Sequence, residues 1–209
     1  LNAVRLIGKI EKELGYQISL KAIFDYPTIA SLSLFLEQSE TQELKSITRT
    51  EIKSYYPITL PQYAIWLASF QSEKSVAYNM FRSYKVKGAC DYILLEKAFR
   101  KIIDKYEILR TNFVEYQGSP YQIIKSSKET FFKIDRFFVD DAGMKNELEE
   151  YANQEFDLND ETLVRLGLFE TSAGDSFLLF VTHHIMMDGW SLEVLIKELV
   201  AHYISFTSK

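Results

Sequence analysis

The sequence predicts an α/β (α+β) sandwich that follows a small all-α unit at the N-terminus. Apolar residues near the N-terminus recur only at helical spacing. The rest of the chain mixes strand-like and helix-like segments, as in domains that pack helices on a sheet. A polar, charged stretch separates the two parts and indicates a linker. We therefore expect a first unit over residues 1–38, a linker over 39–54 and a main unit over 55–209.

The first unit is predicted to consist of short amphipathic helices. Leu1–Leu14 carries an apolar stripe at helical spacing, and Gly15 follows it as a helix-ending residue. A short element covers Leu20–Phe24, and Thr28 suits the N-cap of a last helix over Ile29–Leu36. Short helices with one apolar face each cannot make a robust core in so few residues. We expect this unit to be part of a larger bundle or to pack on something else.

The main unit is predicted to begin with a helix over Pro61–Phe70, because proline suits the first helical position. Met80–Gly88 alternates in the manner of a strand. Asp91 is expected to cap a long helix whose buried side extends to Ile108.

A hairpin and a run of mixed elements complete the main unit. The turn Gln117–Pro120 joins two strand-like runs, Thr111–Tyr116 and Tyr121–Ile124. The elements after the hairpin are predicted in this order: strand Phe131–Val139, helix Ala142–Phe156, strands Leu163–Glu170 and Phe177–His183, and helix Trp190–Phe206. This mixture predicts a sheet with its helices on one side.

Composition excludes several classes of function. The 209 residues are 47% hydrophobic, enough for one sizeable core. The net charge of −5 is spread along the sequence without a basic stripe, so no nucleic-acid partner is expected. No segment has the length of a membrane span and no signal peptide is evident, so we expect no membrane partner and a cytoplasmic protein. Cys90 is the only cysteine and His202 stands alone on a helix, so no disulfide or metal site is expected.

The residues suited to catalysis gather in Val181–Ser191, with the sequence VTHHIMMDGWS. His183 and His184 lie where a buried strand ends, and Asp188-Gly189 closes the loop that follows. Loops at the ends of strands often carry function, and neutral imidazole is the usual general base near neutral pH. Other schemes lack residues, because the chain has no G-x-S-x-G elbow and no glycine-rich phosphate loop.

Residues 1–36 resemble the second half of a peptidyl carrier protein from a nonribosomal peptide synthetase. The similar sequence is LNAVRLIGKIEKELGYQISLKAIFDYPTIASLSLFL. In that family the serine that carries 4′-phosphopantetheine directly precedes the position of Leu1. The resemblance implies that this cofactor is bound to partner carrier domains and that its attachment serine is not in this sequence.

The main unit resembles the N-terminal lobe of a condensation domain of these synthetases, within the chloramphenicol acetyltransferase-like superfamily. The signature is His183-His184-x-x-x-Asp188-Gly189, and the residues after it look like an elongation condensation domain. Other segments similar to family motifs are TLPQYAIWL (Thr59–Leu67), VAYNM (Val76–Met80), KYEILRTNF (Lys105–Phe113) and FDLNDETLVRLGLF (Phe156–Phe169). The sequence departs from the family at Tyr63-Ala64, where a basic residue is usual, and at Lys105 and Tyr106, where arginine and histidine are usual.

The resemblance implies that the domain joins two carrier-bound amino acids. His184 is expected at the midpoint of a tunnel, where it takes a proton from the attacking amine or orients it. His183 is expected to form hydrogen bonds within the scaffold. Gly189 is expected to permit the turn and a close approach of substrate, and Trp190 to pack in the core.

Asp188 is expected to be a structural acid, because a carboxylate near a tunnel is costly unless a cation pairs with it. By resemblance the partner is an arginine of the same lobe. The candidates are Arg110 and Arg165, with Lys105 in the place of another family arginine.

The resemblance also implies partners. These are donor and acceptor carrier domains, a C-terminal condensation lobe and an adenylation domain of the same assembly line. The fragment alone is expected to be inactive and, with apolar surface exposed, to self-associate. Two alternatives stay open: a stand-alone acyltransferase of the same superfamily, against which the carrier remnant argues, and a non-catalytic lobe that docks carriers. The departures at Lys105, Tyr106 and Tyr63-Ala64 keep the second alternative open.

Overall fold

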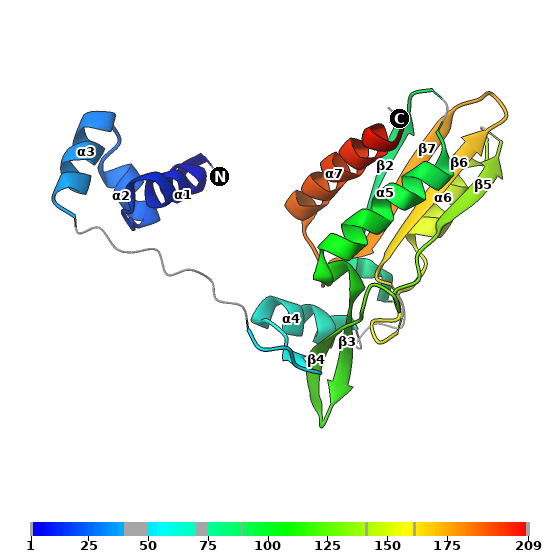
Figure 1. Cartoon of the computed structure of the whole chain (residues 1–209), viewed down its shortest axis with the longest axis horizontal. Coiled ribbons are helices and arrows are strands. Elements are labelled where there is room, and N and C mark those ends of the chain that lie inside the picture. The colour runs from blue at the N-terminus through cyan, green and yellow to red at the C-terminus, as the bar shows by residue number, and fades with distance from the viewer. Residues whose placement is uncertain are drawn as a thin grey trace. The chain divides into compact units, whose positions relative to one another are not determined.

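The computed structural model describes residues 2–39, 50–69, 75–88, 90–140, 142–160 and 162–207. The chain divides into two compact units, Leu1–Ile52 and Lys53–Lys209 (Figure 1). Most of the predicted linker over 39–54 lies outside the described residues, so its limits stay a prediction.

The smaller unit contains the predicted short helices: α1 (Asn2–Leu14), α2 (Leu20–Asp25) and α3 (Ile29–Glu37). Gly15 ends α1 with a φ of 75°, a conformation that glycine adopts without strain. The Thr28 hydroxyl accepts a hydrogen bond from the Ser31 backbone N–H at 3.1 Å, which confirms Thr28 as the N-cap of α3.

The larger unit is built on a sheet with the strand order β2-β7-β6-β5. Its strands are β2 (Asn79–Val86), β5 (Ile134–Val139), β6 (Val164–Thr171) and β7 (Ser176–His183). Neighbouring strands are antiparallel except for β5 and β6, which are parallel. β7 has a strand on either side, and its residues Leu178–His183 are buried throughout. The buried strand that ends at the two histidines is therefore at the centre of the fold.

Helices cover both faces of this sheet. On one face α5 (Tyr92–Lys105) and α7 (Gly189–Thr207) lie side by side (Figure 1), and Phe99 of α5 meets Phe180 edge-on at 6.0 Å. On the other face Tyr151 of α6 (Met144–Ala152) packs edge-on against Phe169. The α/β sandwich is confirmed, but the expectation that all helices lie on one side was wrong. Successive residues of β6 and β7 are buried on both faces, so both faces need cover.

A second, smaller sheet with the order β1-β4-β3 contains the predicted hairpin. Its strands are β1 (Tyr56–Pro57), β3 (Thr111–Tyr116) and β4 (Ser119–Ile124). Gln117 and Gly118 form the tip of the hairpin with positive φ angles of 53° and 75°. The remaining elements are α4 (Leu60–Ser69) and the short 3₁₀ segments η1 (Ser75–Tyr78) and η2 (Glu107–Arg110).

Three predicted elements are shorter in the structure. The helix that Asp91 caps ends at Lys105, because Tyr106 has an extended backbone, and Ile108 lies in η2. The strand expected from Phe131 begins at Ile134, because Arg100 binds the carbonyls of Thr130 and Phe132 instead. The helix expected over Ala142–Phe156 covers only Met144–Ala152.

Candidate active site

The histidine loop is held by elements on both sides of it. Asn79 of β2 pairs in register with His183, and the His184 backbone N–H donates to the Tyr78 carbonyl at 2.8 Å. From α4, the Gln62 side-chain amide donates to the Ile185 carbonyl at 3.3 Å. The loop is therefore held at His183 by β2, at His184 by the end of η1 and at Ile185 by α4.

His184 is exposed at the end of β7, and its imidazole has a defined orientation. Its Nδ1 lies 2.8 Å from the Met187 carbonyl oxygen. A carbonyl can only accept, so this hydrogen bond places the ring proton on Nδ1 and leaves the Nε2 lone pair free. An exposed imidazole with Nε2 unprotonated is suited to accept a proton or to orient an amine.

His183 is buried and faces the scaffold, with only 1% of its surface exposed. Its Nδ1 accepts a hydrogen bond from the Ile185 backbone N–H at 3.2 Å, so its ring proton is on Nε2. Burial, together with the neighbouring His184, lowers the pKa of His183 from 6.5 to about 4. His183 is therefore neutral at neutral pH and holds the loop through its hydrogen bond with the Ile185 backbone N–H.

Asp188 stands just before α7 and is exposed. Its carboxylate accepts hydrogen bonds from the backbone N–H and the hydroxyl of Ser191. These bonds, the hydroxyl contact first, lower the pKa of Asp188. Asp188 therefore caps the N-terminus of α7.

The expected pairing of Asp188 with a cation is wrong for the described part of the chain. Arg110 pairs with Glu107 and donates to the Lys125 carbonyl, and Lys105 pairs with Glu198. Arg165 donates to the main-chain carbonyls of Gln154 and Glu155, which follow α6. The expectation rested on a desolvated carboxylate, whereas Asp188 is in contact with solvent and needs no cation.

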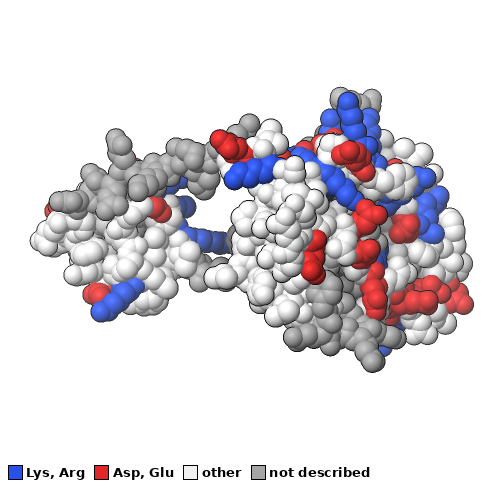
Figure 2. All heavy atoms as spheres, turned by 90° about the horizontal axis from the view of Figure 1, so that it is seen from below, with Lys and Arg blue, Asp and Glu red and all other residues white. Residues whose placement is uncertain are grey.

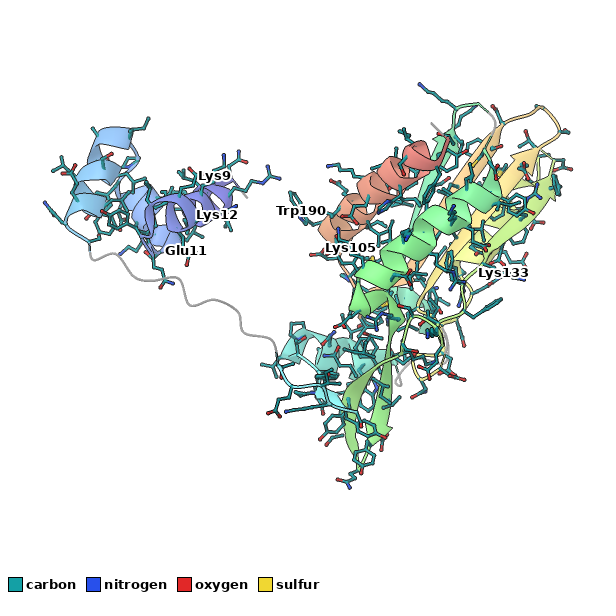
Figure 3. The ribbon with its side chains drawn as sticks, viewed as in Figure 1. Lys9, Glu11, Lys12, Lys105, Lys133 and Trp190 are labelled. Atoms are coloured by element: carbon teal, nitrogen blue, oxygen red, sulfur yellow. The ribbon has the colours of Figure 1, made fainter. Side chains whose placement is uncertain are left out.

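Two further expectations for the loop need correction. Gly189 does not have a positive φ, and a Cβ added to it would meet no atom within 4 Å, so the turn does not require glycine, whereas the close approach of substrate to Gly189 stays a prediction. Trp190 is 53% exposed rather than packed in the core. Figure 3 shows it projecting outward from the first turn of α7. It borders an apolar hollow of about 230 Å³ that Tyr106, Met187 and Val194 also line.

The departures from the family motif at Lys105 and Tyr106 have a common partner on α7. Lys105 Nζ contacts Glu198 Oε1, and the Tyr106 hydroxyl donates to the same oxygen at 3.0 Å. The pair therefore joins the C-terminal end of α5 to α7.

Two residues that support the loop were not singled out by the sequence. Asn79 lies within the VAYNM motif, and its side-chain amide donates to the carbonyls of Ala152 and Gln154. Phe156 was predicted in a helix but lies in the segment after it, where its ring meets His183 edge-on. The family motif was the only signal for Asn79, and no local pattern indicates a ring that packs on a distant histidine.

Among the described residues, no three or more His, Cys, Asp or Glu side chains come together in a group that could hold a metal ion. Among the described helices, none combines the length and the apolar character required to cross a membrane. Figure 2 shows acidic and basic side chains interspersed on the face it presents.

The profile of the condensation domain family matches residues 52–209, which include the whole histidine loop. The chain belongs to this family. A second profile, for the phosphopantetheine attachment site, matches residues 1–36. Both resemblances drawn from the sequence are thus confirmed at the level of the family.

Curated relatives of the condensation domain are large synthases. The chain is 32% identical over 203 residues to bacitracin synthase 2 of Bacillus licheniformis, which covers 97% of the chain and 8% of the relative. It is also 32% identical over 204 residues to surfactin synthase subunit 1 of Bacillus subtilis (strain 168), covering 97% of the chain and 6% of the relative. The chain therefore spans less than a tenth of the length of these relatives.

Solved structures share the fold. The starter condensation domain of the rhizomide synthetase RzmA has a TM-score of 0.68 and 20% identity, with 75% of this chain and 38% of that chain covered. The X-domain in a complex with OxyB from teicoplanin biosynthesis has a TM-score of 0.68 and 27% identity, with 78% and 34% covered. The chloramphenicol acetyltransferase-like fold expected from the sequence is confirmed.

Proposed function

We propose that this condensation domain forms an amide bond between two carrier-bound acyl groups and that His184 acts on the attacking amine. The observation that carries the proposal is the hydrogen bond from His184 Nδ1 to the Met187 carbonyl. It directs the basic Nε2 away from the loop, where a substrate amine can reach it.

In the proposed reaction the amine nitrogen of the acceptor attacks the carbonyl carbon of the donor thioester. The C–N bond forms and the C–S bond breaks, so the donor thiol leaves and takes up a proton while the nitrogen loses one. His184 Nε2 either accepts the proton or holds the amine in line by a hydrogen bond. His183 and Asp188 support the loop and do not touch the reacting atoms.

We propose donor and acceptor carrier domains as partners, each bearing 4′-phosphopantetheine, together with a C-terminal condensation lobe and an adenylation domain. The phosphopantetheine profile over residues 1–36 supports an assembly line of this kind. The described serines of the carrier unit do not suit the cofactor. Ser19 caps α2, Ser31 and Ser33 lie within α3, and Ser39 donates to the Phe35 carbonyl.

The carrier match also weighs against a stand-alone acyltransferase. A non-catalytic docking lobe was suggested by the departures at Lys105, Tyr106 and Tyr63-Ala64. Glu198 binds the side chains of Lys105 and Tyr106, so these two departures give no reason to expect a damaged site.

The test is a single-turnover assay of the full-length protein with loaded donor and acceptor carriers. His184→Ala is expected to remove most amide formation, whereas His202→Ala, a histidine of α7 outside the loop, is a matched control expected to keep it. His184→Gln places a hydrogen-bonding amide near the ε position but no base of suitable pKa. A rate close to wild type for His184→Gln assigns a positioning role, and a rate close to wild type for His184→Ala refutes the proposal.

A further inference from the structure

We infer that Arg165 and Asn79 are positioning residues, which clamp the segment Gln154–Phe156 against His183 and thereby hold the loop that presents His184. The kinetic part of this inference rests on the proposed function, and its structural part does not.

The first step is a shared clamp on main-chain carbonyls just after α6. The Asn79 amide donates to the carbonyls of Ala152 at 2.9 Å and Gln154 at 2.8 Å. Arg165 Nη1 donates to the same Gln154 carbonyl at 3.1 Å, and its Nη2 donates to Glu155. Charged donors on main-chain carbonyls are strong hydrogen bonds, and together they fix the path of a segment that has left the helix.

The second step is the position of the Phe156 ring. The guanidinium carbon of Arg165 lies 3.8 Å from the centroid of this ring, a close cation–π contact. The ring in turn meets the His183 imidazole edge-on, with centroids 6.3 Å apart and planes at 84°. Phe156 is buried, and His183 is 1% exposed. Arg165, Phe156 and His183 therefore form one stack, with the histidine at its inner end.

The third step leads from His183 to the loop. The imidazole accepts the Ile185 N–H through Nδ1, and only a neutral ring can do so. The titratable and charged groups around it are His184 next in the chain, Tyr78 of η1 with its ring 6.1 Å away, and Arg165 behind Phe156. Without the stack, His183 loses the ring that covers it and gains solvent, which favours its protonated form.

The consequence is a pH signature specific to this arrangement. A His183 that regains an ordinary pKa is about nine-tenths protonated one pH unit below that pKa. The ratio of the Arg165→Ala rate to the wild-type rate is then expected to fall about tenfold between pH 8 and pH 5.5.

The experiment measures single-turnover rates across this pH range and hydrogen exchange of the loop peptide around residues 184–188 in the full-length protein. Arg136→Ala is the matched control, because Arg136 lies on β5, pairs with Glu170 at 2.7 Å and stacks on Tyr92. Arg165→Ala is expected to show the pH-dependent ratio and faster exchange in the loop, and Arg136→Ala neither. If Arg165→Ala does not fold, Phe156→Leu keeps the apolar bulk and is expected to give the same two changes to a smaller extent.

A rate ratio independent of pH overturns the link through His183, even where the rate itself is lower. Unchanged exchange in the loop overturns the clamp. Exchange does not depend on turnover, so these results are distinct from a failure of the proposed function, which the His184→Ala rate reports.

Discussion

The carboxylate of Asp188 accepts two hydrogen bonds from Ser191, one from its backbone N–H at 2.8 Å and one from its hydroxyl at 2.7 Å. Asp188 therefore caps the N-terminus of α7, and it pairs with no arginine among the residues that the structure describes. Its contribution comes from the acceptor oxygen and its place at the positive end of the helix.

We predict that Asp188→Ala lowers the free energy of unfolding by about 1 kcal/mol, the usual effect of removing an N-cap. Asp188→Asn keeps an acceptor oxygen and is expected to have a stability close to wild type. Denaturant unfolding of the three proteins at neutral pH measures this difference. If Asp188→Asn lowers the free energy of unfolding as much as Asp188→Ala does, the negative charge itself is required. That result would support the original expectation of a cation paired with Asp188.

We predict that His183 makes the fold sensitive to acid. Its pKa is about 4 in the folded protein and 6.5 without the fold, so the unfolded state binds more protons between these values. The stabilisation is complete above pH 6.5 and declines as pH falls toward 4, by about 3 kcal/mol in total. Unfolding measured from pH 7.5 to 4 tests this slope. His183→Asn keeps an acceptor near the δ position and is expected to remove this part of the pH dependence; an unchanged slope would mean that other groups cause it.

We predict that the contact of Glu198 with α5 has a salt-sensitive and a salt-insensitive part. The Lys105 side chain is exposed, so salt screens its ion pair with Glu198. Lys105→Ala is therefore expected to lower the stability of the fold slightly at low salt and not at about 1 M salt, where the Debye length is only about 3 Å. Tyr106→Phe removes a partly buried hydrogen bond and is expected to cost about 1 kcal/mol at either salt concentration. Thermal unfolding of the single and double variants at both ionic strengths separates the two parts. Equal salt dependence of both variants would contradict this division.

We predict opposite outcomes for alanine at two glycines. At Gly167 of β6 a Cβ would lie 2.7 Å from Phe169 Cε2 and 3.1 Å from Tyr151 Cε1, so Gly167→Ala is expected to destabilise by about 1–3 kcal/mol. At Gly189 a Cβ meets nothing within 4 Å, so Gly189→Ala is expected to fold as well as wild type. Unfolding measurements compare the two variants. If Gly189→Ala folds normally but loses amide formation, the missing Cβ serves the approach of substrate; a destabilised Gly189→Ala would contradict the geometry.

The sequence was sufficient for features that depend on local pattern. Asp91 caps α5, Thr28 caps α3 and β7 ends at His183, as predicted. Helix caps and apolar runs depend on residues that are neighbours in the sequence, so a local pattern predicts them. Phe156 was misplaced because its apolar character fits either a helix face or a ring that packs on His183. Arg165 was one of the candidate partners of Asp188 that the family resemblance implied. The main-chain carbonyls that it binds after α6 cannot be recognised from a sequence.

The ring proton positions of the two histidines were equally out of reach of sequence reasoning. His183 and His184 are adjacent and chemically identical, and the strand alternation places them on opposite sides. Only the geometry of the loop gives one of them a carbonyl partner and the other an N–H partner.

The pairing of Asn79 with His183 has a consequence for how the lobe is made. It joins residues about a hundred positions apart, a separation that makes closure slow compared with local contacts. On a ribosome, β2 has emerged long before β7, and until then one edge of β2 lacks its partner strand. The histidine loop is thus among the last parts of the sheet to be assembled, and mutations that slow the β2–β7 pairing are expected to reduce the yield of native protein during synthesis.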